Sequence, residues 1–313
     1  MTPAACPLPK RIEIVEVSPR DGLQNEPAAV STQDKLALID KLVAAGAKRI
    51  EATSFVDPRR VPQMADAEAV MSGLHQRHDG VSFSGLVLNA RGAERAVAAG
   101  CHELTYVVVA SETFSLRNQG RSVADTIAAW QRVAVVGKEA GRRCNVLVAA
   151  AFGCPFEGLV PREQVLAIVK AVAGMAPDEI GLADTIGAGT PGQVAEMFDG
   201  ARAAVAGMVW RAHFHDTRNM GIANAHAALL SGVTVLDASA GGIGGCPFAP
   251  GATGNIASED LVYLLDGLGI ESGLKGPALA RLAPWLEARL GHPTPGSLGK
   301  AGWFPAESDL MKP

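Results

Sequence analysis

The sequence predicts an α/β protein with a closed barrel of eight parallel strands, a (β/α)8 TIM barrel that carries extra C-terminal helices. Short apolar segments alternate strictly with amphipathic helical segments, in about eight units over roughly 250 residues. Strict alternation favours a mainly parallel sheet, and eight units of this length match the size of a TIM barrel. Several strand segments, such as 106–110 and 146–151, are almost continuously apolar, as expected for strands buried on both faces.

An open, doubly wound sheet is the alternative fold for alternating elements. No Gly-x-Gly-x-x-Gly motif follows the first strand, which disfavours the dinucleotide-binding form of that fold. We therefore predict a single catalytic domain over residues 1–313, with the barrel at about 11–270 and a helical extension at about 271–313.

The strands are recognised by alternating or continuous apolar residues between turn residues. In the first strand, Ile12 and Ile14 alternate with polar residues before the chain breaks at Ser18 and Pro19. In chain order, we expect strands at about 11–17, 49–52, 81–89, 104–110, 144–151, 179–183, 209–215 and 233–238.

The helices are recognised by apolar residues at helical spacing, opened by a capping residue and closed by a glycine. Ser31 and Gly46 delimit the first helix in this way. We expect segment 111–122 to be a polar loop and the glycine- and proline-rich tail from Pro293 to be irregular. The further helices are expected at about 62–77, 91–99, 123–140, 162–174, 192–206, 222–230, 258–267 and 277–290.

Composition and charge exclude several classes of protein. The net charge of −4 provides no basic excess for a nucleic-acid surface. Five cysteines, an odd number with no Cys-x-x-Cys pair, argue against a disulfide framework or a structural zinc site and fit a reducing compartment. The apolar runs are too short to span a bilayer. We expect a soluble, cytoplasmic protein with no membrane or nucleic-acid partner.

Two histidines end the seventh strand. His213 and His215 are two positions apart, so their side chains share one face of the strand, while Phe214 takes the other. Two imidazoles side by side can hold one metal ion. The alternative is two histidines that are each satisfied by hydrogen bonds, and this segment alone leaves both interpretations open.

Polar residues also follow the other strands, at the end where TIM-barrel active sites lie. Each has a structural alternative: a turn residue for Asp21, a helix cap for Asp184 and a small buried filler for Cys246. Convergence of all of them on one rim favours a site. The set comprises Arg20, Asp21, Glu51 (alternatively the partner of a buried arginine), Asp184, His213, His215, Asp216, Cys246, Asn255 and Glu259.

The candidate metal ligands are a carboxylate, two imidazoles and an amide oxygen. These donors favour Mg²⁺ or Mn²⁺ over a soft metal. Such an ion acts as a Lewis acid and as a template for a substrate with neighbouring oxygens.

Seven segments carry longer motifs: 17–26 (VSPRDGLQNE), 54–58 (SFVDP), 61–64 (VPQM), 153–158 (GCPFEG), 183–187 (ADTIG), 213–217 (HFHDT) and 244–263 (GGCPFA through GNIASEDLVY). In this order they resemble the 3-hydroxy-3-methylglutaryl-CoA lyase family, over about residues 12–270. The resemblance implies a metal-dependent TIM barrel, active as a homodimer, that cleaves 3-hydroxy-3-methylglutaryl-CoA to acetyl-CoA and acetoacetate by retro-aldol cleavage.

The resemblance also implies roles for individual residues. It implies metal ligands at Asp21, His213, His215 and Asn255. Arg20 would face the thioester carbonyl, and Gln24 and Asn118 would contribute to the site for the coenzyme A substrate. Supporting catalytic roles fall to Glu51, Asp184 and His213, and the glycine-rich loop with Cys246 would close over the substrate.

Chemistry suggests which of these groups move protons. Retro-aldol cleavage removes a proton from the tertiary hydroxyl and leaves an enolate of acetyl-CoA. Asp184 is the candidate base, directly or through His213. Cys246 is the candidate proton donor to the enolate, because a thiol pKa near about 8.5 suits a donor at neutral pH.

Some positions depart from the family pattern. Arg218-Asn219-Met220 stand where the family usually has Tyr-Gly-Gln, which adds a cation beside the expected site. Asn145, Ala149 and Ala150 replace an arginine and small polar or sulfur residues. The exact acyl group therefore stays open. The alternatives are a citramalyl-CoA-type lyase, a related condensing synthase, and a barrel that binds without catalysis.

Overall fold

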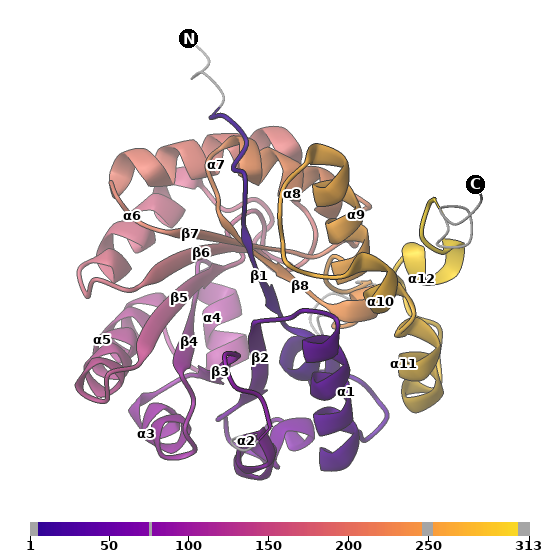
Figure 1. Cartoon of the computed structure of the whole chain (residues 1–313). Helices are drawn as coiled ribbons and strands as arrows, with labels where there is room; N and C mark the ends of the chain where they lie inside the picture. The colour runs from indigo at the N-terminus through magenta and orange to yellow at the C-terminus, as the bar shows by residue number, and fades with distance from the viewer. Residues whose placement is uncertain (1–5, 75–76, 246–252, 306–313) are drawn as a thin grey trace.

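A computed structural model describes residues 6–74, 77–245 and 253–305 of the chain. Eight strands form one closed barrel in chain order, and every neighbouring pair is parallel, which confirms the predicted TIM barrel. Figure 1 shows β1 beside β8 at the centre, although they come from opposite ends of the chain. The strands are β1 (Glu13–Glu16), β2 (Arg49–Ser54), β3 (Ser82–Val87), β4 (Glu103–Val109), β5 (Arg143–Ala149), β6 (Glu179–Asp184), β7 (Trp210–Phe214) and β8 (Val235–Ala238).

Helices surround the barrel, and short ones extend it after the last strand (Figure 1). The inner faces of most of these helices are buried against the strands in one large apolar core, and Phe114 of the segment 112–119 packs in a second, smaller cluster. The helices between the strands are α1 (Thr32–Ala44), α2 (Ala67–Leu74), α3 (Ala90–Ala98), α4 (Glu112–Gln119), α5 (Val123–Glu139), α6 (Arg162–Ala173), α7 (Pro191–Ala204) and α8 (Gly221–Leu230). After β8 come α9 (Ser258–Leu268), α10 (Gly276–Ala280), α11 (Ala283–Leu290) and α12 (Leu298–Ala301).

Three expected segments differ from the structure. The predicted loop 111–122 contains α4, which Ser111 caps by accepting the N–H of Phe114 at 3.3 Å and Gly120 ends with a φ of 69°. The segment 111–122 is polar and so predicts a loop, but the capping residues at its two ends define a helix. The predicted helix 62–77 divides into a short 3-10 turn at Pro62–Met64 and α2, and the tail expected to be irregular contains α12.

The barrel interior carries buried charges at the amino ends of the strands. The Arg49 guanidinium lies between the carboxylates of Glu103 and Glu179, and all three side chains are buried. Asn145, where an arginine was expected from the family pattern, donates to Glu103 at 2.9 Å. Arg49, with Arg143 bound to Glu179 at 2.8 Å, supplies the positive charge at this end of the barrel.

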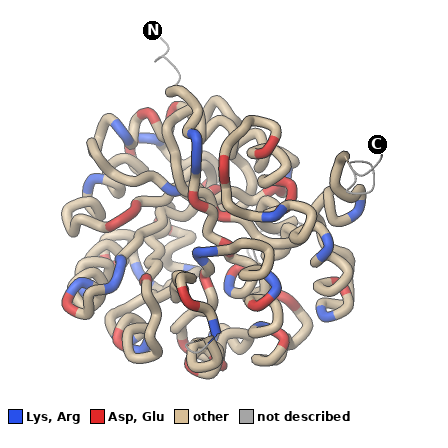
Figure 2. Tube along the Cα trace, in the orientation of Figure 1, with Lys and Arg blue, Asp and Glu red and all other residues tan. Residues whose placement is uncertain are grey.

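The outer surface carries charges of both signs. In Figure 2 the basic and acidic residues are interspersed around the ring of helices, and neither sign gathers on one side in this view. Among the described residues, no helix combines the length and apolar character that a membrane crossing requires.

Candidate active site and metal centre

A tight turn after β1 presents Arg20 and Asp21. The chain forms a π-helical turn at Ser18–Gly22, in which the carbonyl of Val17 accepts the backbone N–H groups of Arg20, Asp21 and Gly22 at 3.2, 2.8 and 3.1 Å. Such turns occur frequently at functional sites. A Cβ on Gly22 would lie 2.7 Å from Ile243. Glycine therefore lets this turn approach the segment after β8 closely.

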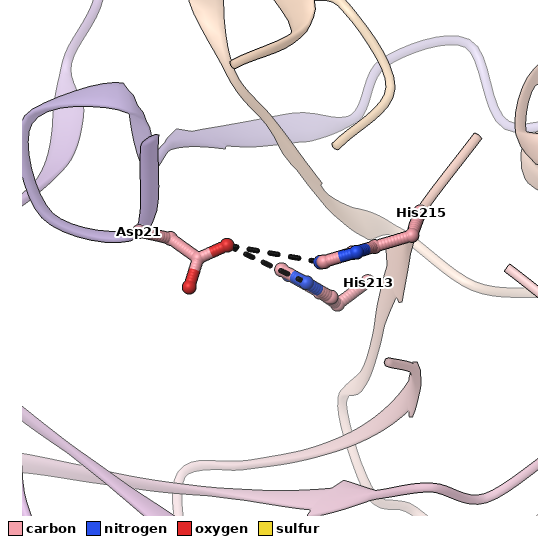
Figure 3. A group of neighbouring side chains, drawn as sticks. All are labelled: Asp21, His213 and His215. Carbon is pink, nitrogen blue, oxygen red and sulfur yellow. Dashed lines mark ion pairs between the residues drawn. The ribbon is translucent and has the colours of Figure 1, made fainter. Parts of the chain in front are cut away.

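Asp21 meets the two histidines of the seventh strand. Phe214 is buried on the opposite face against Phe152, with ring centroids 6.0 Å apart, so His213 and His215 point together into the barrel mouth. Their Nε2 atoms lie 4.0 and 3.8 Å from Asp21 Oδ2 (Figure 3). These three residues form a cluster with metal-ligand spacing.

Asn255 completes the cluster from the far end of the chain. Its Nδ2 donates to Asp21 Oδ2 at 2.7 Å and to the carbonyl of Ile243 at 3.0 Å. A backbone bridge also joins Asn255 to His215. Gly244, with a φ of 110°, permits this contact, because a Cβ there would lie 2.6 Å from Asn255 Nδ2.

The cluster fits a divalent ion. Within the described part of the chain, Asn255 Oδ1 is buried and lacks a hydrogen-bond partner, an arrangement that is costly unless another group uses this oxygen. A carboxylate, two imidazoles and an amide suit Mg²⁺ or Mn²⁺. Burial alone would raise the pKa of Asp21, but Arg20 and the two histidines hold it well below its usual range. The carboxylate is thus ionised, as a ligand must be.

Arg20 is fixed between two carboxylates. Its Nε donates to Glu51 Oε1 and its Nη1 donates to Asp21 Oδ1 at 2.6 Å. Glu51 is fully buried. The structural alternative for Glu51, an ion pair with a buried arginine, therefore holds, and that arginine is itself a site residue.

A cavity of about 290 Å³ opens at the carboxyl ends of the strands beside this cluster. Its lining combines polar residues, which include the metal cluster, with apolar ones, among them Leu86, Val107, Leu147 and Ala149. The cavity brings together most of the expected site residues: Arg20, Asp21, Gln24, Glu51, Asn118, His213 and His215.

Asp184 has contacts that differ from those of a base facing the substrate. Its two carboxylate oxygens accept the backbone N–H groups of Ala188 and Gly189 at 2.9 and 2.8 Å. Ala183 and Thr185 line the described cavity wall, whereas Asp184 does not. Burial raises the pKa of Asp184. The observed contacts of Asp184 are those of a capping residue, and its role as the base stays a prediction.

The unexpected Arg218 does not add a cation to the cavity. Its Nη1 donates to the carbonyls of Ile186 and Gly187 at 3.0 and 2.8 Å, and it is not among the described residues that line the cavity. The side chain instead holds the loop after β6. The remaining candidate, Cys246, lies outside the described residues.

Two buried charges at the site escaped the sequence analysis. Asp237 Oδ2 lies 3.0 Å from His213 Nδ1, and Asp237 Oδ1 accepts the Nε–H of Arg211 at 2.5 Å. Both residues line the cavity. A signal was present, because Asp237 interrupts an apolar strand and Arg211 shares the strand face of His213 two positions away.

Comparisons with known proteins place this site in a family. The chain is 44% identical to the (R)-citramalyl-CoA lyase of Chloroflexus aurantiacus, with 93% of this chain and 95% of that protein covered. It is 40% identical to a hydroxymethylglutaryl-CoA lyase of Bacillus subtilis, with 92% and 96% covered. The structure of an HMG-CoA lyase from Acinetobacter baumannii, in complex with coenzyme A and 3-methylmalate, superposes with a TM-score of 0.90 at 40% identity over 97% and 98% of the two chains.

The family model described as HMGL-like matches residues 11–285, which includes the whole barrel and every described residue of the metal cluster. The resemblance inferred from the motifs is thereby confirmed: the chain belongs to the HMGL-like family.

Proposed function

We propose that the protein is a divalent-metal-dependent carbon–carbon lyase that cleaves 3-hydroxy-3-methylglutaryl-CoA to acetyl-CoA and acetoacetate. The observation that carries this proposal is the cluster of Asp21, His213 and His215 beside Arg20 in one cavity. Relatives at 40–42% identity over nearly the whole chain are hydroxymethylglutaryl-CoA lyases, which supports the same chemistry.

Asp21, His213, His215 and Asn255 are the residues we propose to hold the ion, with Mg²⁺ or Mn²⁺ as the candidates. When bound, such an ion supplies Lewis-acid polarisation of the substrate hydroxyl. The unpartnered Oδ1 of Asn255, among the described atoms, and the ionised carboxylate of Asp21 support this assignment.

We assign to Arg20 the stabilisation of the enolate. Its guanidinium lines the cavity and cannot swing away freely, because Glu51 and Asp21 hold it on two sides. A fixed positive charge at the oxygen that becomes anionic contributes on the order of 3–4 kcal/mol to transition-state stabilisation in comparable sites.

Proton transfer requires a base and an acid. The candidate base is Asp184, acting directly or through His213, and the contacts disfavour both routes. The carboxylate of Asp184 accepts backbone N–H groups, and His213 directs Nδ1 to Asp237 and Nε2 to Asp21. The base accepts the hydroxyl proton, the carbon–carbon bond breaks, and the bonding electrons form the enolate of acetyl-CoA. We keep Cys246 as the donor of the proton that converts this enolate to acetyl-CoA.

The coenzyme A moiety is proposed to enter past Gln24 and Asn118. Arg60 and Arg121 also line the cavity, and their described hydrogen bonds go to the backbone carbonyls of Asn118 and Leu88. Guanidinium groups suit the phosphates of coenzyme A.

We further propose a cytoplasmic homodimer. The free thiols among the described cysteines agree with a cytoplasmic location, and two-fold dimers are the most frequent oligomers.

Cleavage of a citramalyl-CoA-type substrate is the second candidate function. The 44% identity to an (R)-citramalyl-CoA lyase favours it. The same catalytic set would serve both substrates, because each is a 3-hydroxyacyl-CoA with a second carboxylate. The departure at Ala149 changes the cavity lining without removing any described catalytic candidate, whereas Asn145 belongs to the network at the amino ends of the strands.

The experiment is a comparison of both thioesters. Purified protein is stripped with a chelator and assayed for acetyl-CoA with each substrate, before and after addition of Mg²⁺ or Mn²⁺. We expect metal-dependent release of acetyl-CoA and acetoacetate from 3-hydroxy-3-methylglutaryl-CoA. Cleavage of (R)-citramalyl-CoA alone would replace the named substrate, and absence of cleavage of either substrate with metal present would overturn the lyase assignment.

A further inference from the structure

We infer that Asp237 and Arg211 form a positioning pair beneath the metal centre, which orients His213 toward the ion and couples it to the Arg20–Glu51 pair. This inference rests on the proposed function for its catalytic meaning, whereas its geometry stands independently. Both residues line the cavity, and the role that we infer is exerted through the side chains of His213 and Arg20.

The sheet register brings these groups to one level. β7 and β8 are neighbours, with Arg211 opposite Val235 and Ala212 opposite Leu236. His213 and Asp237 are the next residues in line, so their side chains meet inside the barrel. Arg211 lies on the same face of β7 as His213, one layer deeper. The register therefore builds the pair from strands, the most rigid elements of the fold.

Asp237 determines which nitrogen of His213 carries the proton. An ionised carboxylate only accepts hydrogen bonds, so the 3.0 Å contact with Oδ2 requires a proton on Nδ1 of His213. The lone pair of a neutral ring then lies on Nε2, which faces Asp21. A histidine that ligates a metal through one nitrogen is commonly held through the other by such a carboxylate.

Arg211 keeps Asp237 charged and in place. Asp237 is 2% exposed and Arg211 is 1% exposed, so neither charge is hydrated, and each depends on the other. Arg211 Nη2 also lies 4.0 Å from Glu51 Oε2. Since Glu51 binds Arg20, one guanidinium links the supports of His213 and Arg20.

Stability alone does not explain why the ion pair of Arg211 and Asp237 lies inside the barrel. Replacement of a buried ion pair by apolar residues is often neutral or stabilising, so stability alone gives little reason for charges at this depth. Arg211 Nη1 lies 4.0 Å from Glu179 Oε2 but has no hydrogen-bond partner among the described residues, which a pair optimised for stability would avoid. Orientation of the catalytic groups accounts for both features.

The test compares Asp237→Asn with Glu103→Gln, a matched loss of a buried carboxylate that pairs with an arginine at the other end of the barrel. Mn²⁺ affinity is measured by electron paramagnetic resonance, and the His213 tautomer by ¹⁵N NMR of histidine-labelled protein. In Asp237→Asn, the amide can accept from His213 only by turning its NH₂ toward Arg211. We expect about a 10- to 100-fold loss of Mn²⁺ affinity and a changed His213 signal, with both unchanged in Glu103→Gln.

Arg211→Lys is the second variant, for use if Asp237→Asn does not fold. It keeps a cation but loses the Nε donor to Asp237. We expect weaker Mn²⁺ binding from it, by about tenfold, the lower end of effects for outer-shell partners. Wild-type Mn²⁺ affinity and an unchanged His213 tautomer in the folded variants would overturn the inference. Because neither readout uses a thioester, failure of the wild-type protein to cleave any acyl-CoA would contradict the proposed function while leaving this test intact.

Discussion

The buried polar groups at the two ends of the barrel interior differ in how they are hydrogen-bonded. At the amino ends of the strands, Arg49 donates from all three guanidinium nitrogens to the carboxylates of Glu103 and Glu179, which in turn accept from Ser82, Asn145 and Arg143. At the carboxyl ends, the described part of the chain leaves buried polar atoms without hydrogen-bond partners: His215 Nδ1, Asn255 Oδ1 and Glu51 Oε2.

This difference in hydrogen bonding indicates that one end of the barrel contributes to stability and the other to ligand binding and catalysis. The amino-end network pairs each of its charged groups internally, although Asn145 Oδ1 has no partner among the described atoms, and removing one charged member leaves an uncompensated charge. An open cluster keeps capacity for a ligand and is less stable for it. Substitutions at the amino ends should therefore change the free energy of unfolding, and those at the carboxyl ends should change metal binding and turnover.

The largest effect is expected at the open end. Asp21→Ala removes the carboxylate that faces both histidines, while Arg20 keeps its bond to Glu51. We expect turnover to fall by about 10³-fold or more, since a metal contributes several kcal/mol to catalysis, and Mn²⁺ binding to be lost with little change in melting temperature. Acetyl-CoA release and Mn²⁺ titration measure this. A large drop in melting temperature with metal binding retained would break the comparison.

The closed end should show the reverse. Glu103→Gln leaves Arg49 with one carboxylate fewer in a buried site, and we expect a loss of about 3–5 kcal/mol in the free energy of unfolding. Mn²⁺ affinity should match that of the wild type. Urea unfolding monitored by circular dichroism gives the first quantity. A stable variant with impaired metal binding would show that the two ends are not independent.

A substitution at Asp184 tests whether this residue contributes to stability or to catalysis. Asp184→Asn retains one acceptor for the backbone of Ala188 and Gly189 and loses the other, so we expect about 1–3 kcal/mol of destabilisation. Turnover should fall by less than the roughly 10²–10⁴-fold that removal of a general base produces. A fall within that range at unchanged melting temperature would instead establish Asp184 as the base.

A buried acid beside the segment after β8 should make stability depend on pH. Burial raises the pKa of Glu259 to about 8, from 4.5 for an exposed glutamate. Between these values the folded state holds a proton that the unfolded state has released, so the free energy of unfolding should decrease as pH rises from about 5 to 8. Denaturant titrations at several pH values measure the slope. Glu259→Gln should reduce this slope, and an unchanged slope would contradict the assignment.

The smallest effect is expected at Arg218. Arg218 is exposed, its hydrogen bonds to two backbone carbonyls are half-buried, and it is not among the described residues that line the cavity. Arg218→Met should alter stability by about 0.5 kcal/mol or less and leave the ratio of kcat/KM for the two candidate thioesters unchanged. A shift of that ratio by more than about tenfold would return Arg218 to the role of a substrate-selecting cation.

The sequence predicts the fold because strand and helix periodicity are local properties. Most of the residues that it assigns to the site line the cavity, since the carboxyl ends of parallel strands meet at one rim. It fails where the answer depends on the contacts of a single side chain. Asp184 and Arg218 look similar to site residues by position, yet backbone groups occupy their polar atoms. Asp237 looks like a strand residue and yet contacts His213.

The most direct test of the account is anomalous diffraction from crystals grown with Mn²⁺. The account predicts one peak in the space among Asp21 Oδ2, the Nε2 atoms of His213 and His215, and Asn255 Oδ1, and no peak among Arg49, Glu103 and Glu179. A manganese peak elsewhere in the barrel, with the cluster of Asp21, His213 and His215 showing none at saturating Mn²⁺, would contradict it.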